Sequence, residues 1–283
     1  MTKGTKVQYI AENLPKLLPG KEVTISEVVK NGRLMTGVSA KKPGTNTAPM
    51  TYLECFDIED PEELCKEIAG VLMRAKVPEA DPNLLLHDKD FVRSHIHPVL
   101  CPSEKKPDDV VTVREIGDIS LLLEIELFQD GFIKVTNTVL KEIGMSKEEA
   151  LSTAMANNEP AITRTEDHVK QLYGGAAPVN LYEEEERGDH CQTQLVVSNR
   201  DPYHGAAVIM DDRVIARLHE MLGESFFVLP SSVHEIICQP VDDTIDVESL
   251  RDVVQMVNQM GVLPEDQLSN KVYICEHGKI RVA

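Results

Sequence analysis

The segment Pro230–Glu235, with the sequence PSSVHE, brings two serines, a histidine and a glutamate together. Hydrolases combine these residue types so that a histidine takes the serine proton while a carboxylate orients the histidine. In an extended segment Ser232 and His234 share one face and Glu235 points to the other, so the orienting acid would have to come from elsewhere in the fold. The alternative interpretation is structural, in which the two serines satisfy backbone groups of a turn.

Two polar residues upstream could lie near this segment. Asn199 follows a predicted strand, and His204 belongs to the tract Asp201–Gly205, where it could stand at a rim beside the serines. We therefore predict one ligand-binding set, whose members are Asn199, His204, Ser231, Ser232, His234 and Glu235. The alternative is that Asp201–Gly205 is only a tight turn, in which Gly205 supplies a positive φ.

A second group contains His95, His97 and Cys101. In an extended segment the two histidines point to one face, and Zn²⁺ accepts imidazole nitrogen and thiolate sulfur, so these residues could ligate zinc. Their spacing matches no familiar zinc module, and the alternative is a polar loop with solvent-facing histidines and one small apolar thiol. We therefore expect no cofactor, and the three residues are only candidate metal ligands.

A third group is the pair Glu124 and Glu126 in the predicted strand 119–128. The two glutamates share one face, because side chains alternate along a strand, and a carboxylate pair can carry acid–base chemistry. The alternative is that this face is the solvent face of a half-buried strand. The sequence contains no GxxxxGK[ST], GxGxxG, HExxH or GxSxG motif, so it does not decide whether the protein is an enzyme.

The chain has 283 residues, with 29 Lys and Arg against 47 Asp and Glu, for a formal charge of −18. Residues 1–50 carry 8 basic and 3 acidic side chains, so the remainder carries 21 against 44, or −23. Nucleic-acid phosphates repel such a chain, which argues against direct nucleic-acid binding. The acidity either provides solubility alone or forms a face that binds another protein, for which a basic nucleic-acid-binding protein has complementary charge.

Neither a membrane segment nor an export signal is predicted. Apolar stretches such as 121–123 are far shorter than the roughly 20 residues that span a bilayer, and residues 1–12 contain no apolar signal region. The six cysteines form no CxxC pair and are interpreted as reduced thiols. We therefore expect a cytoplasmic protein.

Turn residues, helix caps and hydrophobic spacing predict the elements. Asn31-Gly32 predicts a hairpin between strands 23–30 and 33–40, and Asp130-Gly131 joins a central strand pair. In the C-terminal part, Asp211 and Asp246 each begin an amphipathic helix. The predicted strands there are 194–198, 206–210, 226–229, 233–239, 272–275 and 279–282. The resulting order β-β-α-β-β-α-β-β favours an α+β fold with a mostly antiparallel sheet and helices packed on it.

An acidic segment divides the chain in this interpretation. Residues 173–192 contain Gly174-Gly175, Pro178 and four consecutive glutamates, and adjacent like charges rarely enter a core. We therefore predict three parts, which are an N-terminal α+β region at 1–172, an acidic connector at 173–192 and a C-terminal α+β region at 193–283.

The chain also resembles a family of uncharacterised bacterial proteins. The stretches that carry the resemblance are DISLLLEIELFQDGFIKVTNTVLKEIGMSKEEAL, SNRDPYHGAAVIM, FFVLPSSVHEIICQP and LRDVVQMVNQMGVLPEDQLSNKVYICEHGKI. The tract LPSSVHE is its most specific part. The family consists of domain-of-unknown-function proteins that are frequent in gut Firmicutes and their mobile elements. The resemblance implies a bacterial, cytoplasmic α+β protein carried by a phage or another mobile element, and it transfers no reaction or ligand to Pro230–Glu235.

Two functions follow as expectations. The first is a non-enzymatic interaction with another protein, with an inhibitory or regulatory effect, through the acidic surface. The alternative is an enzyme or small-ligand binder that uses the turn Ser231–Glu235.

Overall fold

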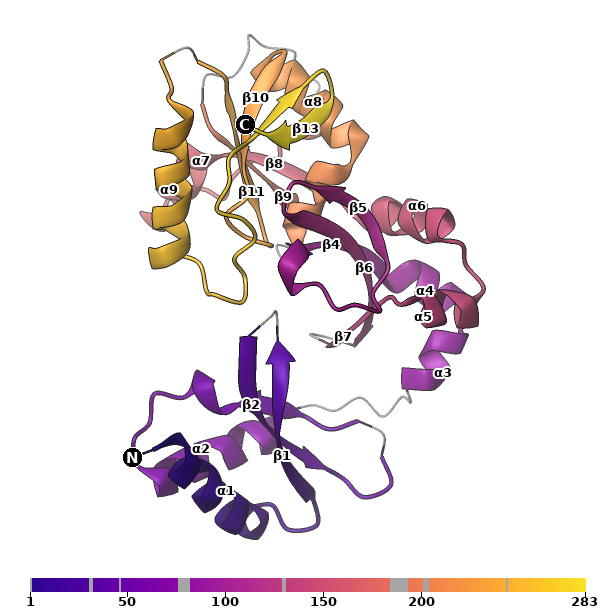
Figure 1. Ribbon diagram of the computed structural model, residues 1–283, viewed down its shortest axis with the longest axis vertical. Helices are drawn as coiled ribbons and strands as arrows, with labels where there is room; N and C mark the ends of the chain where they lie inside the picture. The colour runs from indigo at the N-terminus through magenta and orange to yellow at the C-terminus, as the bar shows by residue number, and fades with distance from the viewer. Residues whose placement is uncertain are drawn as a thin grey trace. The chain divides into compact units, whose positions relative to one another are not determined.

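The computed structural model shows an α+β protein whose strands pair antiparallel, which confirms the predicted fold class (Figure 1). The described residues are 2–30, 33–45, 47–75, 82–128, 131–183, 193–200, 204–242 and 244–283. The chain divides into two compact units, Met1–His87 and Asp88–Ala283. Within the described ranges, no helix combines the length and the apolar character needed to cross a bilayer.

The first unit packs two helices against a three-stranded sheet. Its elements are α1 (Lys3–Leu17), β1 (Glu22–Lys30), β2 (Arg33–Lys41), β3 (Met50–Tyr52), the 3₁₀ helix η1 (Leu53–Cys55), α2 (Pro61–Arg74) and α3 (Pro82–His87). The predicted hairpin is confirmed in β1 and β2, whereas its Asn31-Gly32 turn lies outside the described residues. Asp60 begins α2 by accepting backbone hydrogen bonds from Glu62 and Glu63, a role that aspartate favours at the start of a helix. The core joins apolar side chains of α1, β2 and α2.

The second unit contains a four-stranded sheet centred on β6. The strands of this sheet are β4 (Ile96–Pro102), β5 (Thr112–Ile116), β6 (Ile119–Phe128) and β7 (Gly131–Lys134). β4 pairs with one edge of β6, and β5 and β7 share the other edge. The helices next to these strands in the chain are α4 (Lys89–His95), η2 (Ser103–Lys105), α5 (Asn137–Ile143) and α6 (Lys147–Asn157). The predicted central strand pair is confirmed in β6 and β7, and residues 129–130 between them lie outside the described ones.

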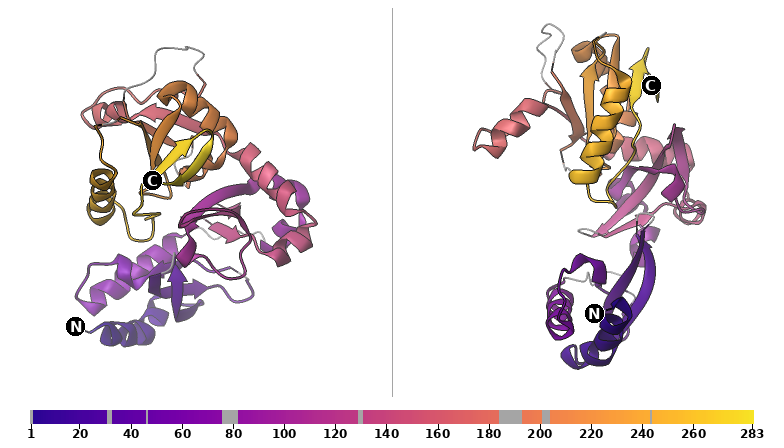
Figure 2. Two further views of the ribbon diagram at one scale, coloured as in Figure 1. Left: turned by 45° about the horizontal axis from the view of Figure 1, so that its top comes forward. Right: turned by 60° about the vertical axis from the view of Figure 1, so that its left-hand side comes forward.

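The second unit also contains a six-stranded sheet with the order β13-β12-β10-β11-β9-β8. Its strands are β8 (Pro160–Arg164), β9 (Leu195–Asn199), β10 (Ser225–Leu229), β11 (Ile236–Pro240), β12 (Tyr273–Glu276) and β13 (Lys279–Val282). The helices of this part are α7 (Thr165–Leu172), η3 (Gly205–Met210), α8 (Asp212–Leu222) and α9 (Val247–Met260). Side chains alternate along β10, so Phe226 packs in the core with α8 and η3 while Phe227 packs with α9. α8 and α9 therefore cover opposite faces of the sheet (Figures 1 and 2).

One predicted strand of the C-terminal part is wrong, because Gly205–Met210 forms the 3₁₀ helix η3. All six of its residues are buried, in a core that also contains Leu121 of the four-stranded sheet and Val197 of the six-stranded sheet. A short apolar run shows that a segment is buried, but its periodicity does not distinguish a strand from another buried conformation. η3 therefore lies between the two sheets and connects β9 to α8.

The boundary between the two compact units lies between His87 and Asp88, and the predicted connector 173–192 falls inside the second unit. β8 precedes this segment and β9 follows it, yet the two strands pair directly with each other. Residues 184–192, including most of the glutamate run, lie outside the described ones. Consecutive like charges indicate that a segment is exposed to solvent. A loop within one unit can be as exposed as a linker between two units, so the charges do not mark a domain boundary.

Candidate functional site

His204 stands directly before η3 and has a left-handed backbone, with φ of 55°. A non-glycine residue keeps this conformation only where the surrounding structure enforces it, and such residues gather at functional sites. Nδ1 of its imidazole lies 2.5 Å from Oε1 of Glu124 in β6. Because η3 is held between the four-stranded and the six-stranded sheet, it brings His204 next to β6, the central strand of the four-stranded sheet.

Glu124 is buried, and the strands on both sides of β6 place basic or ionisable side chains next to it. Lys134 of β7 lies opposite, with its Nζ 2.7 Å from Oε2, and His97 of β4 lies opposite on the other edge. Directly opposed residues project to the same face of an antiparallel sheet. Burial opposes ionisation of Glu124, but the hydrogen bond from His204 and the charge of Lys134 outweigh it and hold its pKa below the usual 4.5. Glu124 is therefore a buried carboxylate, and the solvent-face interpretation of the Glu124–Glu126 pair is wrong for it.

His234 lies beside His204 with the two rings nearly parallel. The ring centroids are 5.8 Å apart, and the interplanar angle is 14°. The backbone N–H of His204 donates to Nδ1 of His234 at 3.2 Å, and Nε2 of His234 lies 3.5 Å from Oδ1 of Asp266. We call Glu124, Lys134, His204, His234 and Asp266 the histidine cluster. Each imidazole in this cluster has its own carboxylate.

The hydrogen bonds assign different tautomers to the two imidazoles. An ionised Glu124 can only accept, so Nδ1 of His204 carries a proton and the lone pair of the neutral ring is on Nε2. Nδ1 of His234 accepts a hydrogen bond, so the proton of its neutral ring is on Nε2, the nitrogen closest to Asp266. The lone pair on Nε2 allows neutral His204 to act as a base. His234 holds the backbone at His204 in place by accepting its N–H.

The two predicted serines serve the turn between β10 and β11. Both are buried, and Oγ of Ser232 accepts the backbone N–H of His234 at 3.0 Å while the carbonyl of Ser231 accepts the N–H of Leu268. For Ser232 this arrangement corresponds to the structural interpretation, in which a serine side chain satisfies a backbone group of the turn. His234 reaches the histidine cluster, whereas Glu235 is exposed. The segment therefore contributes an imidazole to the cluster, and the Ser232 hydroxyl is engaged with backbone.

Asn199 and Gly205 support the loop that carries His204. Nδ2 of Asn199 donates to Oδ1 of Asn158 at 3.2 Å, and its own Oδ1 is buried without a hydrogen-bond partner among the described residues. A Cβ on Gly205 would lie 2.7 Å from that Oδ1 and 2.7 Å from the carbonyl oxygen of His234. The expected positive φ occurs at His204 instead of Gly205, so close packing is what requires the glycine. Residues 201–203 of the predicted turn lie outside the described residues.

The candidate metal ligands do not converge, which corrects the zinc hypothesis. His95 is in helix α4 and not in an extended segment, and its Nδ1 lies 2.8 Å from the carbonyl of Phe91. Cys101 is four residues beyond His97 in β4, or about 13 Å along a strand, whereas zinc ligands lie within about 2.3 Å of the metal. Across the part of the chain that the structure describes, no three His, Cys, Asp or Glu residues are placed to hold a metal ion.

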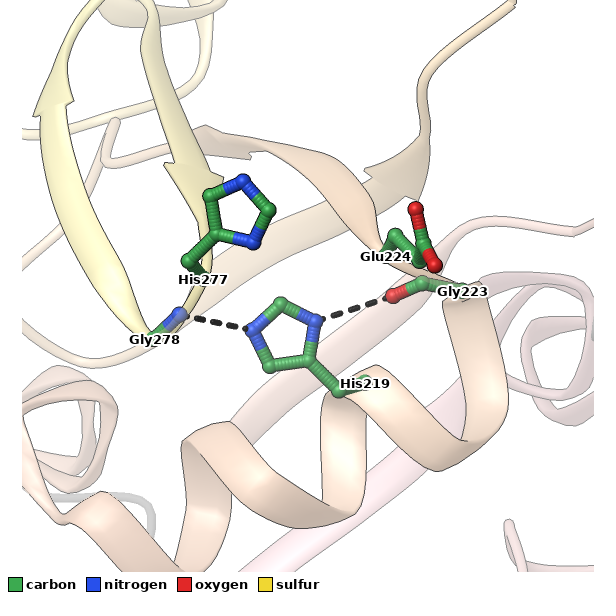
Figure 3. A pocket seen from close by; sticks show the side chains of 5 residues that line it. All are labelled: His219, Gly223, Glu224, His277 and Gly278. Carbon is green, nitrogen blue, oxygen red and sulfur yellow. Dashed lines mark hydrogen bonds between the residues drawn. The ribbon is translucent and has the colours of Figure 1, made fainter.

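A second polar site lies at the end of α8, where an open cavity of about 310 Å³ is lined by His219, Gly223, Glu224, His277 and Gly278 (Figure 3). Nδ1 of His219 donates to the carbonyl of Gly223 at 2.9 Å, and its Nε2 accepts the N–H of Gly278 at 3.2 Å. Because backbone groups engage both ring nitrogens, His219 connects α8 to the β12–β13 turn. This role differs from that of His204, whose Nδ1 is held by a carboxylate.

Cys275 lies next to this cavity, with Sγ 3.7 Å from Nε2 of His219. Burial raises the pKa of its thiol to about 11, so the contact with histidine does not produce a thiolate at neutral pH. We predict that Cys275 resists iodoacetamide in the folded protein at about pH 8, while the exposed Cys55 reacts. Peptide mass spectrometry measures both sites in one sample, and unfolding should make Cys275 reactive. Comparable labelling of both thiols in the folded protein would contradict this assignment.

No local pattern in the sequence points to Lys134 or Asp266. Glu124 stands out there only as one member of the Glu124–Glu126 pair, which either carries acid–base chemistry or faces solvent. A usable signal for Glu124 is the uninterrupted apolar run 121–123 directly before it, because strands buried on both faces have such runs. A glutamate at the end of this run would be buried and would need charged or hydrogen-bonding partners. Asp266 has no comparable signal, since it lies in an irregular segment between α9 and β12.

A known family matches nearly the whole chain. The model of a family described as a family of unknown function (DUF5688) matches residues 6–276. No curated protein and no solved structure matches the chain significantly. The matched range includes the histidine cluster and extends over most of the first unit. In agreement with the resemblance seen in the sequence, the chain belongs to DUF5688, a family of unknown function.

Proposed function

We propose that this protein binds a small polar ligand at the histidine cluster and that Nε2 of His204 accepts a proton from it. The observation that supports this proposal most strongly is the hydrogen bond between His204 and the buried carboxylate of Glu124. A carboxylate that fixes the tautomer and orientation of an imidazole is the arrangement that prepares a histidine as a general base. The left-handed backbone at His204 adds to this support, because it costs about 1–3 kcal/mol and needs a reason to persist.

The remaining members of the cluster act as positioning residues. Lys134 binds Oε2 of Glu124, so Oε1 stays directed at His204. His234 accepts the backbone N–H of His204, and Asp266 lies next to the opposite nitrogen of the His234 ring. Protonation of Nδ1 of His234 would remove this acceptor, so the neutral ring is the state that maintains the loop.

The charge of the cluster narrows the class of ligand. Glu124 and Asp266 contribute two negative charges and Lys134 contributes one positive charge, which leaves −1 when both imidazoles are neutral. The chain as a whole carries −18. An anionic ligand would be repelled by both charges, so a neutral or cationic polar ligand fits better.

Hydrolysis of p-nitrophenyl acetate tests whether His204 is a competent base, because histidine side chains accelerate this reaction. We expect the wild-type chain to release p-nitrophenol about tenfold or more faster than His204→Asn, whose amide can donate to Glu124 but cannot take up a proton. His95→Asn is the matched control, because it removes an imidazole outside the cluster, and its rate should equal that of wild type. Equal rates for wild type and a folded His204→Asn variant would overturn the proposal.

A further inference from the structure

Helix α9 has a buried apolar face and a second apolar face that is exposed. Leu250 and Val254 pack against the six-stranded sheet and are at most 9% exposed. The second face follows spacings of three and four residues and continues beyond the end of the helix. Its members and their exposed fractions are Val253 at 46%, Met256 at 49%, Val257 at 37%, Met260 at 76% and Leu263 at 62%. We call these five residues the α9 stripe.

The α9 stripe is more than a scatter of exposed apolar side chains. Single exposed apolar residues are common, whereas a contiguous apolar patch marks a surface that another molecule covers. Residues three and four positions apart are neighbours on a helix, so the helical members of the stripe form one strip along α9. α9 lies on the face of the six-stranded sheet opposite α8 (Figures 1 and 2). Two members are methionines, whose flexible side chains adapt to a partner surface.

The charges around the stripe indicate which occupant fits. Residues 247–266 contain four acidic side chains against one basic side chain, Arg251, for a net charge of −3. A second copy of the chain in antiparallel contact across the middle of the stripe would place Glu248 opposite Glu265, and a parallel copy would place each residue opposite itself. Both arrangements oppose like charges, and each copy carries −18. A basic partner is therefore favoured over a second copy.

We propose that the α9 stripe is a docking surface for an amphipathic helix of a partner protein, with lysine or arginine beside its apolar face. The apolar side chains of that helix would cover the stripe, and its basic side chains would meet acidic residues such as the exposed Asp252. This inference goes beyond the proposed base at the histidine cluster. It gives the protein interaction expected from the acidic composition a defined contact surface.

Two synthetic helical peptides of about 20 residues test this proposal. Both carry leucines on one face, and they differ only in having lysine or glutamate at the flanking positions. In fluorescence anisotropy titrations we expect the full chain to bind the lysine peptide about tenfold or more tightly than the glutamate peptide, with weaker binding at high salt. Met256→Asp should weaken binding by about tenfold or more. Met73→Asp changes an exposed methionine of α2 in the first unit, so it should bind as wild type does.

Several outcomes would overturn the proposal. They are failure of the lysine peptide to bind at about 1 mM, equal binding of the two peptides, and equal binding by wild type and Met256→Asp. Light scattering that finds a dimer, which Met256→Asp dissociates, would assign the stripe to a second copy instead. Circular dichroism verifies that each variant folds. The ester hydrolysis rate should be unchanged in Met256→Asp, so this proposal and the proposed base at His204 can fail independently.

Discussion

Replacing Gly205 with alanine is expected to lower the free energy of unfolding by about 2–3 kcal/mol and to displace His204. The new Cβ would lie 2.7 Å from the carbonyl oxygen of His234 and 2.7 Å from Oδ1 of Asn199, and closer still to Oγ of Ser198. The His234 carbonyl belongs to the backbone, so it cannot move away as the end of a flexible side chain would. The strain therefore falls on the loop that holds His204 in its left-handed conformation.

Urea denaturation of the Gly205→Ala variant measures the change in the free energy of unfolding. Gly4→Ala is the matched control, because a Cβ there meets nothing within 4 Å and alanine favours the helix, so no loss of stability is expected. The ester hydrolysis rate should fall for Gly205→Ala and stay unchanged for Gly4→Ala. A Gly205→Ala protein with wild-type stability and rate would show that close packing at this position does not hold the loop.

Replacing Glu124 with glutamine should lower stability by about 2 kcal/mol at neutral pH and reduce the ester hydrolysis rate about as much as His204→Asn does. The amide has nearly the same shape but no charge, so Lys134 loses its anion. The amide N–H₂ can donate to Nδ1 of His204, which favours the tautomer with the proton on Nε2. A ring with its lone pair on Nδ1 cannot accept the ligand proton at Nε2. A wild-type rate in this variant would contradict the positioning role of Glu124.

The stability difference between wild type and Glu124→Gln should depend on pH. The pKa of Glu124 is lower in the folded protein than the usual 4.5, because its partners favour the charged form more than burial opposes it. Its stabilising contribution is therefore fully present above pH 4.5 and is lost as the pH falls through the lowered pKa. Denaturation at a series of pH values should show the two proteins converging below pH 4.5. A difference that stays constant over this range would show that the charge of Glu124 is not responsible.

Elements whose interactions are local could be predicted from the residues themselves. Asp60, Asp211 and Asp246 each begin a helix and each accept a backbone N–H within the next three residues. The β12–β13 hairpin joins neighbouring segments in the same way. In these cases the residue and its partner are both present in a short window of sequence, so the type and spacing of residues are sufficient.

The pairing of Lys134 with Glu124 depends on an irregularity in the register of β6 and β7, which no local sequence pattern indicates. Regular pairing continued from Phe128 and Gly131 would place Lys134 opposite Ile125. A register shift between Glu126 and Phe128 places Lys134 opposite Glu124 instead. Because side chains alternate along a strand, this shift of one residue decides which face of the sheet receives the lysine.

The α+β class, the hairpins, several helix starts and the strong negative charge follow from the residues alone, because each of these depends on neighbouring residues or on composition. The contacts that bring Glu124, His204, His234 and Asp266 together arise from the packing of the whole chain, since these residues belong to four separate segments. Their meeting requires β6 to be buried on both faces and η3 to pack between two sheets. Such packing is a property of the whole core, and the spacing of residues within any one segment does not contain it.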